Sequence, residues 1–82
     1  MISIVIGGIQ DDKIVFEARI ATDRIKTSDQ YGVEIKNILS LFEVPVETVE
    51  DVIISSVVPP VFNAVRTGAY KVTGLTPMVV GP

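Results

Sequence analysis

Two runs of β-branched and other apolar residues limit the possible folds more than any other feature of the sequence. One occupies residues 2–9, where Ile4, Val5 and Ile6 are consecutive, and the other spans residues 52–58. A strand with apolar side chains at consecutive positions needs cover on both of its faces, as interior strands of α/β sheets have. The sequence therefore predicts two buried strands, the second of them in a parallel section of a sheet.

A second strand follows the first run after a short polar turn, Gln10–Lys13. Residues 14–21 alternate between two kinds of side chain, with Phe16, Ala18 and Ile20 set against Glu17 and Arg19. This period of two indicates a half-exposed strand that forms a β-hairpin with residues 2–9. Asp11 and Asp12 also fit a metal site or an acid/base pair, but between two strands a solvated hairpin turn is the interpretation we favour.

Two helices are expected from apolar periodicity. The first begins after Thr27, where Gln30 completes a capping box, and Pro45 ends it. Its apolar stripe consists of Tyr31, Ile35, Ile38, Leu39 and Phe42. The second helix begins at Pro59-Pro60 and ends near Gly74. Its apolar face consists of Val61, Phe62, Val65, Ala69 and Val72, and residues 78–80 form a short last strand. The order β-β-α-β-α-β predicts an α/β fold.

Composition excludes several functions. The seven basic residues are dispersed among ten acidic ones, which argues against a nucleic-acid surface. The chain has neither cysteine nor histidine, so disulfides, thiolate nucleophiles, Ser-His-Asp triads and ordinary zinc sites are excluded. The apolar opening is too short for a bilayer span and lacks the layout of a signal peptide, so we expect a cytoplasmic protein with no membrane partner. An apolar content of 48% predicts surfaces that another domain, subunit or chain segment covers.

Two stretches carry a specific resemblance to a known family. ARIATDRIKTSDQYG, residues 18–32, is similar to a family segment in which a strand end and a threonine precede KT-x-D-E-[YF]-G. DVIISSVVPPVF, residues 51–62, is similar to the I-I-S-S-V-V-P-P turn from strand to helix, and PMVVGP at residues 77–82 to the next strand. The chain resembles the amino-terminal portion of a type III pantothenate kinase over nearly all of its 82 residues.

The resemblance implies a fold and an activity. The fold is a partial first lobe of the acetate kinase/Hsp70/actin superfamily (ribonuclease H-like), so residues 1–82 form one partial domain. The activity is ATP-dependent phosphorylation of pantothenate, the first step of coenzyme A synthesis. The family implies Mg²⁺ and a monovalent cation, typically K⁺, as cofactors, and a homo-oligomer, generally a homodimer.

Departures from the family pattern limit what this chain is expected to do alone. Family members begin with a strand that ends in D-x-G-N-T, which handles ATP phosphates, whereas this chain starts near the position of that threonine. Ser3 and Gly7 are then the expected remnant of the phosphate loop, although Gly7-Gly8 also fits a strand bend. The family's catalytic aspartate, potassium ligand and second phosphate loop correspond to positions beyond Pro82. We therefore assign no catalytic or metal-binding residue, and we expect no kinase activity from the isolated chain and no effective cofactor binding.

The missing strand also leads to a structural expectation. In the superfamily fold it lies between the hairpin and the later parallel strands, so the edges of residues 2–9 and 52–58 are expected to be unpaired. Such edges favour aggregation or pairing with another copy. They suggest an alternative function, a non-catalytic module that binds a partner, such as a complete kinase subunit, through its open sheet edge.

A last candidate site follows the strand at residues 52–58. Ligands collect at the carboxyl ends of strands in open α/β sheets, which predicts that Ser56, Val57 and Pro59 line a cleft. The alternative is structural: the hydroxyl groups satisfy nearby backbone groups, and the prolines end the strand.

Overall fold

The computed structural model describes residues 3–23, 25–55 and 59–80. Its elements follow the predicted α/β order, with one short 3-10 helix in addition, between the first long helix and the strand that follows it. In chain order they are β1 (Ser3–Gln10), β2 (Lys13–Ala21), α1 (Ser28–Leu41), η1 (Val46–Thr48), β3 (Asp51–Ser55), α2 (Pro59–Thr73) and β4 (Met78–Val80).

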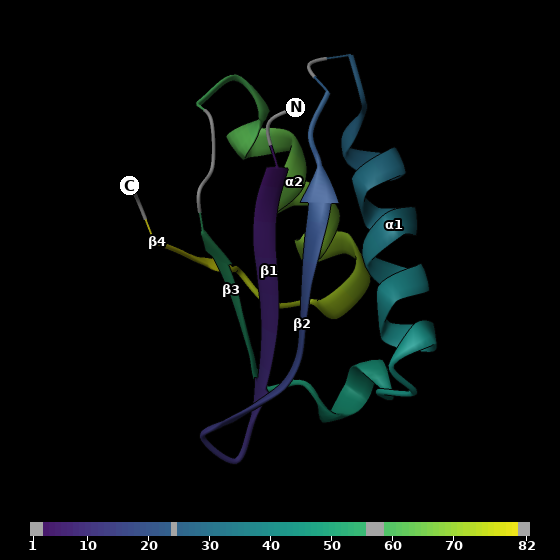
Figure 1. The fold of residues 1–82 in the computed structure, drawn as a ribbon, viewed down its shortest axis with the longest axis vertical. Helices are drawn as coiled ribbons and strands as arrows, with labels where there is room; N and C mark the ends of the chain where they lie inside the picture. The colour runs from purple at the N-terminus through teal and green to yellow at the C-terminus, as the bar shows by residue number, and fades with distance from the viewer. Residues whose placement is uncertain (1–2, 24, 56–58, 81–82) are drawn as a thin grey trace.

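The four strands form one mixed sheet in the order β2-β1-β3-β4 (Figure 1). β1 is antiparallel both to β2 and to β3, whereas β3 and β4 are parallel. The predicted parallel section therefore consists of β3 and β4. Residues 56–58 of the predicted strand 52–58 lie outside the described residues.

β1 and β3 pair directly with each other, which corrects the expectation of two open edges. Their register runs from Val5 opposite Ser55 to Ile9 opposite Asp51. The Glu50 amide extends the ladder by donating a hydrogen bond to the Ile9 carbonyl oxygen over 2.8 Å. Because each strand satisfies the backbone groups along the facing edge of the other, these two edges are not available to a partner.

The turn between β1 and β2 is the predicted hairpin turn. Asp11 and Asp12 have φ angles of 53° and 61°, as the two central residues of a type I′ turn require. Aspartate tolerates this left-handed conformation better than most residues do. The Asp11 amide donates a hydrogen bond to the carboxylate of Glu50, so the turn is tied to the segment that leads into β3.

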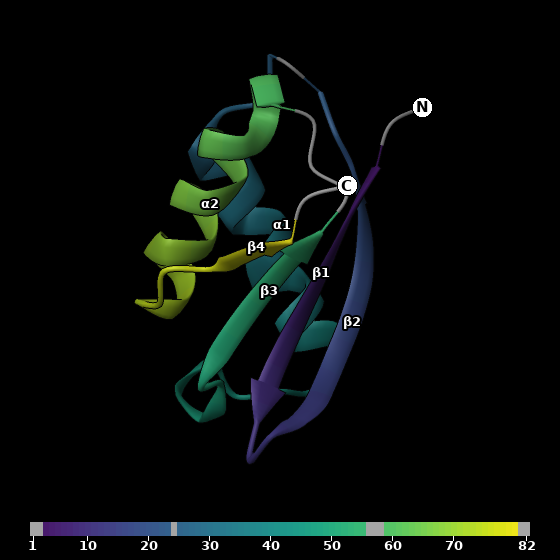
Figure 2. The same ribbon diagram turned by 90° about the vertical axis from the view of Figure 1, so that its left-hand side faces the viewer.

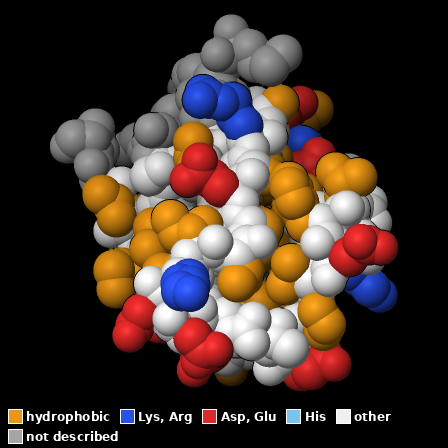
Figure 3. Space-filling view, turned by 60° about the horizontal axis from the view of Figure 1, so that its bottom comes forward, with side chains coloured by type: hydrophobic (Ala, Val, Ile, Leu, Met, Phe, Trp, Pro, Cys, Tyr) orange, Lys and Arg blue, Asp and Glu red, His pale blue; other side chains and the backbone are white. Residues whose placement is uncertain are grey.

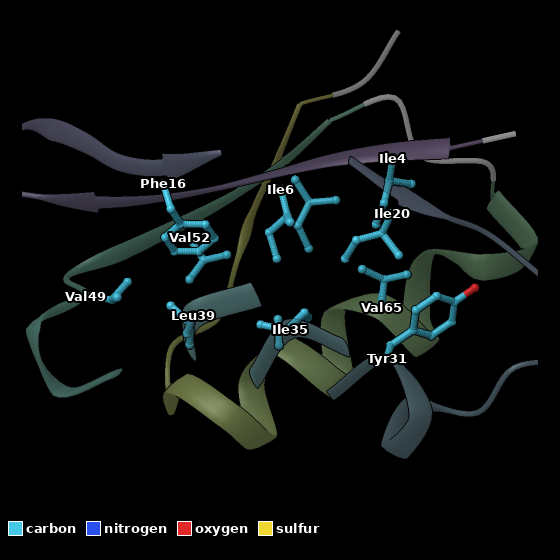
Figure 4. Close-up of a cluster of buried hydrophobic side chains, with 12 residues drawn as sticks. Ile4, Ile6, Phe16, Ile20, Tyr31, Ile35, Leu39, Val49, Val52 and Val65 are labelled. Carbon is cyan, nitrogen blue, oxygen red and sulfur yellow. The ribbon is translucent and has the colours of Figure 1, made fainter. Parts of the chain in front are cut away.

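Both helices lie on the same face of the sheet (Figure 2). Ile4, Ile6 and Ile54 project from that face and are almost completely buried. In Figure 4 the sheet side chains point toward Ile35 and Leu39 of α1 and toward Val65 of α2. This cluster is the core, and it contains most of the predicted apolar stripes of the two helices.

The opposite face of the sheet corrects the expectation that both faces are covered. Side chains alternate along a strand, so Val5 and Ile53 point away from the helices. Both are half-buried, and Met78 and Val80 on β4 are exposed. Within the described residues no helix covers this face.

The predicted helix ends are confirmed for the most part. Thr27 and Gln30 form the reciprocal capping box, and Gly74 follows α2 with a φ of 74°. α1 ends at Leu41, before Pro45, and Glu43 adopts a positive φ of 57° after it. The Phe42 side chain is 47% exposed at this end, so it extends beyond the buried stripe.

The end of the molecule that carries the hairpin turn and the carboxyl end of α1 comes forward in Figure 3. Hydrophobic side chains gather in the middle of that view, with acidic groups along its lower margin. Exposed apolar residues at this end include Ile14 and Leu41. Among the described residues, no helix is long and apolar enough to cross a bilayer.

Candidate functional site

The candidate site lies at the end of the sheet where β3 and β4 finish. Ser55 and Val80 are register partners there, so the carboxyl ends of the two parallel strands meet at one place. β2 ends and α1 begins at the same end of the molecule (Figure 1). In α/β sheets this is where ligands bind, because loops rather than ladder hydrogen bonds follow the strand ends.

Tyr31 fixes the connection between β2 and α1. Its hydroxyl group accepts a hydrogen bond from the Asp23 amide and donates one to the Asp23 carbonyl oxygen, each over 3.1 Å. The side chain is fully buried in the core. One aromatic residue on the apolar stripe of α1 therefore holds the backbone of the loop in a single position.

Lys26 makes a second set of contacts at the same connection. Its ammonium group donates hydrogen bonds to Glu34 Oε1 over 2.9 Å and to the Ala21 carbonyl oxygen over 3.3 Å. It also lies 5.1 Å from the centre of the Tyr31 ring, within the range of a cation–π contact. With only 20% of its side chain exposed, Lys26 links the end of β2 to α1 and is not directed at solvent.

Glu34 leaves one oxygen without a partner. Oε1 pairs with Lys26, whereas Oε2 is buried and has no hydrogen-bond partner. Glu34 also lines two neighbouring surface cavities, one of about 250 Å³ with residues of β2 and one of about 340 Å³ with residues of the first turns of α1. Glu34 is therefore the residue that the two cavities share.

Ser3 and Gly7 occupy positions in β1. Ser3 begins the strand opposite Ala21, and Gly7 lies in its middle, opposite Glu17 on β2 and Ile53 on β3. Gly7 is therefore part of the sheet in this structure and not of a loop. A contact of Ser3 and Gly7 with ATP phosphates stays a prediction.

The predicted cleft residues are only partly described. Ser56 and Val57 lie outside the described residues, and Pro59 is the first residue of α2. Among the described residues, no group of three or more acidic side chains is arranged to hold a metal ion.

The segment 26–32 accounts for a sequence pattern in physical terms. Lys26 bridges β2 and α1, Thr27 caps the helix, Tyr31 holds Asp23, and Gly32 lies against α2. These four residues belong to the KT-x-D-E-[YF]-G-like motif, and each of them helps to position α1. The sequence indicates the cap and the apolar stripe but not the contacts among Lys26, Glu34 and Tyr31, because these contacts depend on how the loop folds.

A comparison with protein families leads to the same family as this motif. The family model for type III pantothenate kinase matches residues 3–82. The chain belongs to the type III pantothenate kinase family. The match includes both sequence stretches on which the resemblance rests, and the observed order of strands and helices is consistent with a partial first lobe of the superfamily fold.

Curated relatives extend this result to individual proteins. A type III pantothenate kinase of Bifidobacterium longum subsp. infantis is 46% identical over 80 residues, which is 98% of this chain and 31% of the relative. The type III pantothenate kinase of an Exiguobacterium species is 42% identical over 80 residues, 98% of this chain and 32% of the relative. That of Syntrophotalea carbinolica is 38% identical over 78 residues, 95% of this chain and 31% of the relative. The chain thus spans about a third of the length of the type III pantothenate kinases that it matches.

Proposed function

We propose that this chain is a segment of a cytoplasmic type III pantothenate kinase, and that the complete enzyme transfers the γ-phosphate of ATP to the hydroxyl group of pantothenate. The observation that carries this proposal is the family match over residues 3–82, supported by relatives named type III pantothenate kinase. The complete enzyme uses Mg²⁺ and a monovalent cation such as K⁺, and its product enters coenzyme A synthesis.

The segment contributes framework rather than chemistry to that reaction. Phosphoryl transfer depends on positioned phosphate-binding loops, metal ions and a base. The polar side chains that the structure places at the end of the sheet, Lys26, Tyr31 and Glu34, make contacts that hold α1 and its loop. We therefore infer that the isolated chain has no kinase activity, and that Ser3, Gly7, Ser56, Val57 and Pro59 approach ligands only within the complete enzyme.

A chimeric enzyme tests the function of the segment. Residues 3–80 replace the aligned segment of the Bifidobacterium longum relative, and pantothenate-dependent ADP release is measured with Mg-ATP and K⁺. We expect the chimera to be active, because the segment supplies a framework of the same fold at 46% identity. The 82-residue chain, assayed alone as the control, is expected to release no ADP above background.

Two outcomes contradict the proposal in different ways. A chimera that is folded and binds Mg-ATP but phosphorylates no pantothenate argues against a shared function. Pantothenate-dependent ADP release by the 82-residue chain alone argues against the inference that the segment is only a framework.

The alternative function, a non-catalytic module that binds a partner, depended on open strand edges that the structure does not show. A non-catalytic module was expected to bind its partner through the facing edges of residues 2–9 and 52–58. β1 and β3 pair with each other over five residue pairs, from Val5–Ser55 to Ile9–Asp51. This form of the alternative is therefore not supported.

A further inference from the structure

The end of the molecule that carries the turn between β1 and β2 combines exposed apolar side chains with negative charge. We call it the hairpin end and define it as residues 10–14 and 41–51. The structure brings these two segments together, because the Asp11 amide donates a hydrogen bond to the Glu50 carboxylate and Ile9 pairs with Asp51. The hairpin end lies at the start of β3, opposite the candidate site at the end of that strand (Figure 1).

Three large apolar side chains are exposed at the hairpin end. Ile14 is 62% exposed and Leu41 77%, and Figure 3 shows hydrophobic side chains in the middle of this surface. Phe42 is also exposed, but the centre of its ring lies 6.4 Å from that of the buried Phe16. The core therefore supports an aromatic ring that a partner can contact. An aromatic side chain that is already held in place loses little conformational freedom on binding.

The charge at the hairpin end is strongly one-sided. Its two segments carry six acidic residues and one basic residue, Lys13, and so a net charge of −5, whereas the whole chain carries −3. All six acidic residues are exposed: Asp11, Asp12, Glu43, Glu47, Glu50 and Asp51. The remainder of the chain is therefore net positive, and the negative charge of this protein is concentrated around one apolar surface.

This charge decides what kind of partner fits the surface. Nucleic acids and anionic lipid membranes present negative groups, which the hairpin end would repel. A second copy of the chain presents the same acidic surface, so contact between two hairpin ends brings like charges together. A polypeptide that carries lysine or arginine beside apolar side chains complements both the charge and the apolar centre.

The arrangement of the two features favours an amphipathic segment. Interfaces between proteins commonly have an apolar core and a polar rim, and charges at the rim select the partner and speed its approach. A helix with an apolar stripe flanked by basic residues presents the complementary pattern. Its apolar side chains would cover Ile14, Leu41 and Phe42, while its cations approach the acidic margin.

We propose that the hairpin end is a docking surface for a basic amphipathic segment of another protein. Its apolar centre consists of Ile14, Leu41 and Phe42, and the six acidic residues surround it. This inference does not rest on the proposed kinase function, because it concerns the end of the sheet away from the candidate site.

A model peptide tests the complementarity of charge. The probe is a fluorescent peptide of about 15 leucine and lysine residues, long enough to form a helix, with its leucines on one helical face. A matched peptide has glutamate in place of every lysine. Titration with the 82-residue chain, followed by anisotropy, is expected to give a dissociation constant at least about tenfold lower for the lysine peptide, and added salt is expected to raise it. Equal affinities of the two peptides would overturn the proposal.

Two substitutions on α1 distinguish this surface from other exposed apolar residues. Leu41→Ser removes an apolar side chain of the hairpin end, and Val33→Ser removes one that is exposed elsewhere on the same helix. Leu41→Ser is expected to raise the dissociation constant of the lysine peptide at least about fivefold, as the loss of a central interface contact does, whereas Val33→Ser is expected to leave it unchanged. Circular dichroism checks that both variants fold. Equal effects of the two would contradict binding at the hairpin end.

Nuclear magnetic resonance locates the lysine peptide without any substitution. The amide signals of Ile14, Leu41 and Phe42 are expected to shift most during the titration. The competing apolar surface is the uncovered face of the sheet, where Met78 and Val80 are exposed. Shifts concentrated on β4 would place the peptide on that face and would overturn the assignment.

Paired neutral variants separate the acidic margin from the net charge of the chain. Asp12→Asn/Glu47→Gln removes two negative charges from the hairpin end, and asparagine tolerates the left-handed backbone at position 12. Glu17→Gln/Asp29→Asn removes two charges from exposed sites elsewhere. The first pair is expected to raise the dissociation constant of the lysine peptide at least about threefold and the second to leave it unchanged. Equal effects would mean that only the overall charge attracts the peptide, against the proposal.

The chimeric enzyme described above decides whether the partner is a separate protein. It holds residues 3–80 within a complete kinase, and this test requires that it be folded but not that it be active. We expect the lysine peptide to bind it with a dissociation constant within about threefold of that for the 82-residue chain. Loss of binding in the folded chimera would mean that other segments of the kinase cover the hairpin end, and the proposal of a separate partner would then be wrong.

Discussion

Gly32 of α1 and Gly68 of α2 lie in direct backbone contact where the two helices pack together. A Cβ atom added at Gly68 would lie 2.6 Å from the Ser28 carbonyl oxygen and 2.8 Å from the Gly32 amide nitrogen. Both distances are shorter than any normal contact, and the atoms that they involve belong to a helix backbone. Glycine at position 68 therefore sets the separation of α1 and α2, although in the sequence it looks like an interruption of the apolar face.

We expect Gly68→Ala to destabilise the protein by a net value of about 1 kcal/mol, because the helices must move apart and overpacking of this kind costs about 1–3 kcal/mol. The cost exceeds the gain of about 1 kcal/mol in helix propensity. Gly32→Ala is the matched control, since its Cβ atom would lie 3.3 Å from the Gly68 carbonyl oxygen, a contact that small shifts relieve. Urea denaturation followed by circular dichroism measures both free energies of unfolding. A Gly68→Ala variant as stable as the unchanged chain would contradict this helix contact.

The Tyr31 hydroxyl group is the second feature with a clear energetic consequence. Tyr31→Phe removes the bonds to the Asp23 amide and carbonyl but keeps the buried ring. We expect a loss of about 1 kcal/mol in the free energy of unfolding, the usual value for such hydrogen bonds. Amide exchange is expected to become faster at Asp23.

Tyr70→Phe serves as the control for Tyr31→Phe, because the Tyr70 side chain is 54% exposed. It is expected to change neither the stability nor the amide exchange of the loop. Equal effects of the two substitutions would mean that the Tyr31 hydroxyl group does not hold the connection.

The capping box at the start of α1 makes a third prediction. Thr27→Ala removes the hydroxyl oxygen that accepts a hydrogen bond from the Gln30 amide over 3.2 Å. Loss of such a cap costs about 1 kcal/mol. Thr67→Ala is the control, since Thr67 is exposed within α2, where alanine is favoured. Thermal or urea unfolding is expected to show Thr27→Ala as destabilising and Thr67→Ala as neutral or stabilising.

How far the sequence predicted this structure depends on the range of the interactions involved. The Thr27 cap, the Asp11-Asp12 turn and Gly74 rest on contacts between residues close in the chain, and the structure confirms all three. Pairing of β1 with β3 joins segments more than forty positions apart, and alternation of side chains says nothing about which strand lies next to which. The family resemblance placed another strand between them, so the prediction of open edges was wrong.

The candidate site was harder to predict than the fold for a related reason. Lys26 was recognisable as part of a motif, but its role required knowing that the loop brings its ammonium group to both Glu34 and Ala21. From the sequence, Gly68 is recognisable only as a glycine within a helix. Its role becomes clear only when the position of the facing helix α1 is known. The predicted ligand contacts of Ser3 and Gly7 depend on ligands and chain segments outside this structure, so they remain predictions.

The pairing of β1 with β3 is central to this fold, because it joins the β1–β2 hairpin to β3 and β4 and places Ile6 and Ile54 together in the core. The decisive measurement is a set of cross-strand nuclear Overhauser effects between backbone protons of the isolated chain. We expect contacts that join Ile6 to Ile54 and Gly8 to Val52, together with slow amide exchange along the facing edges of both strands. A folded chain that lacks these contacts, with freely exchanging amides along those edges, would contradict the account.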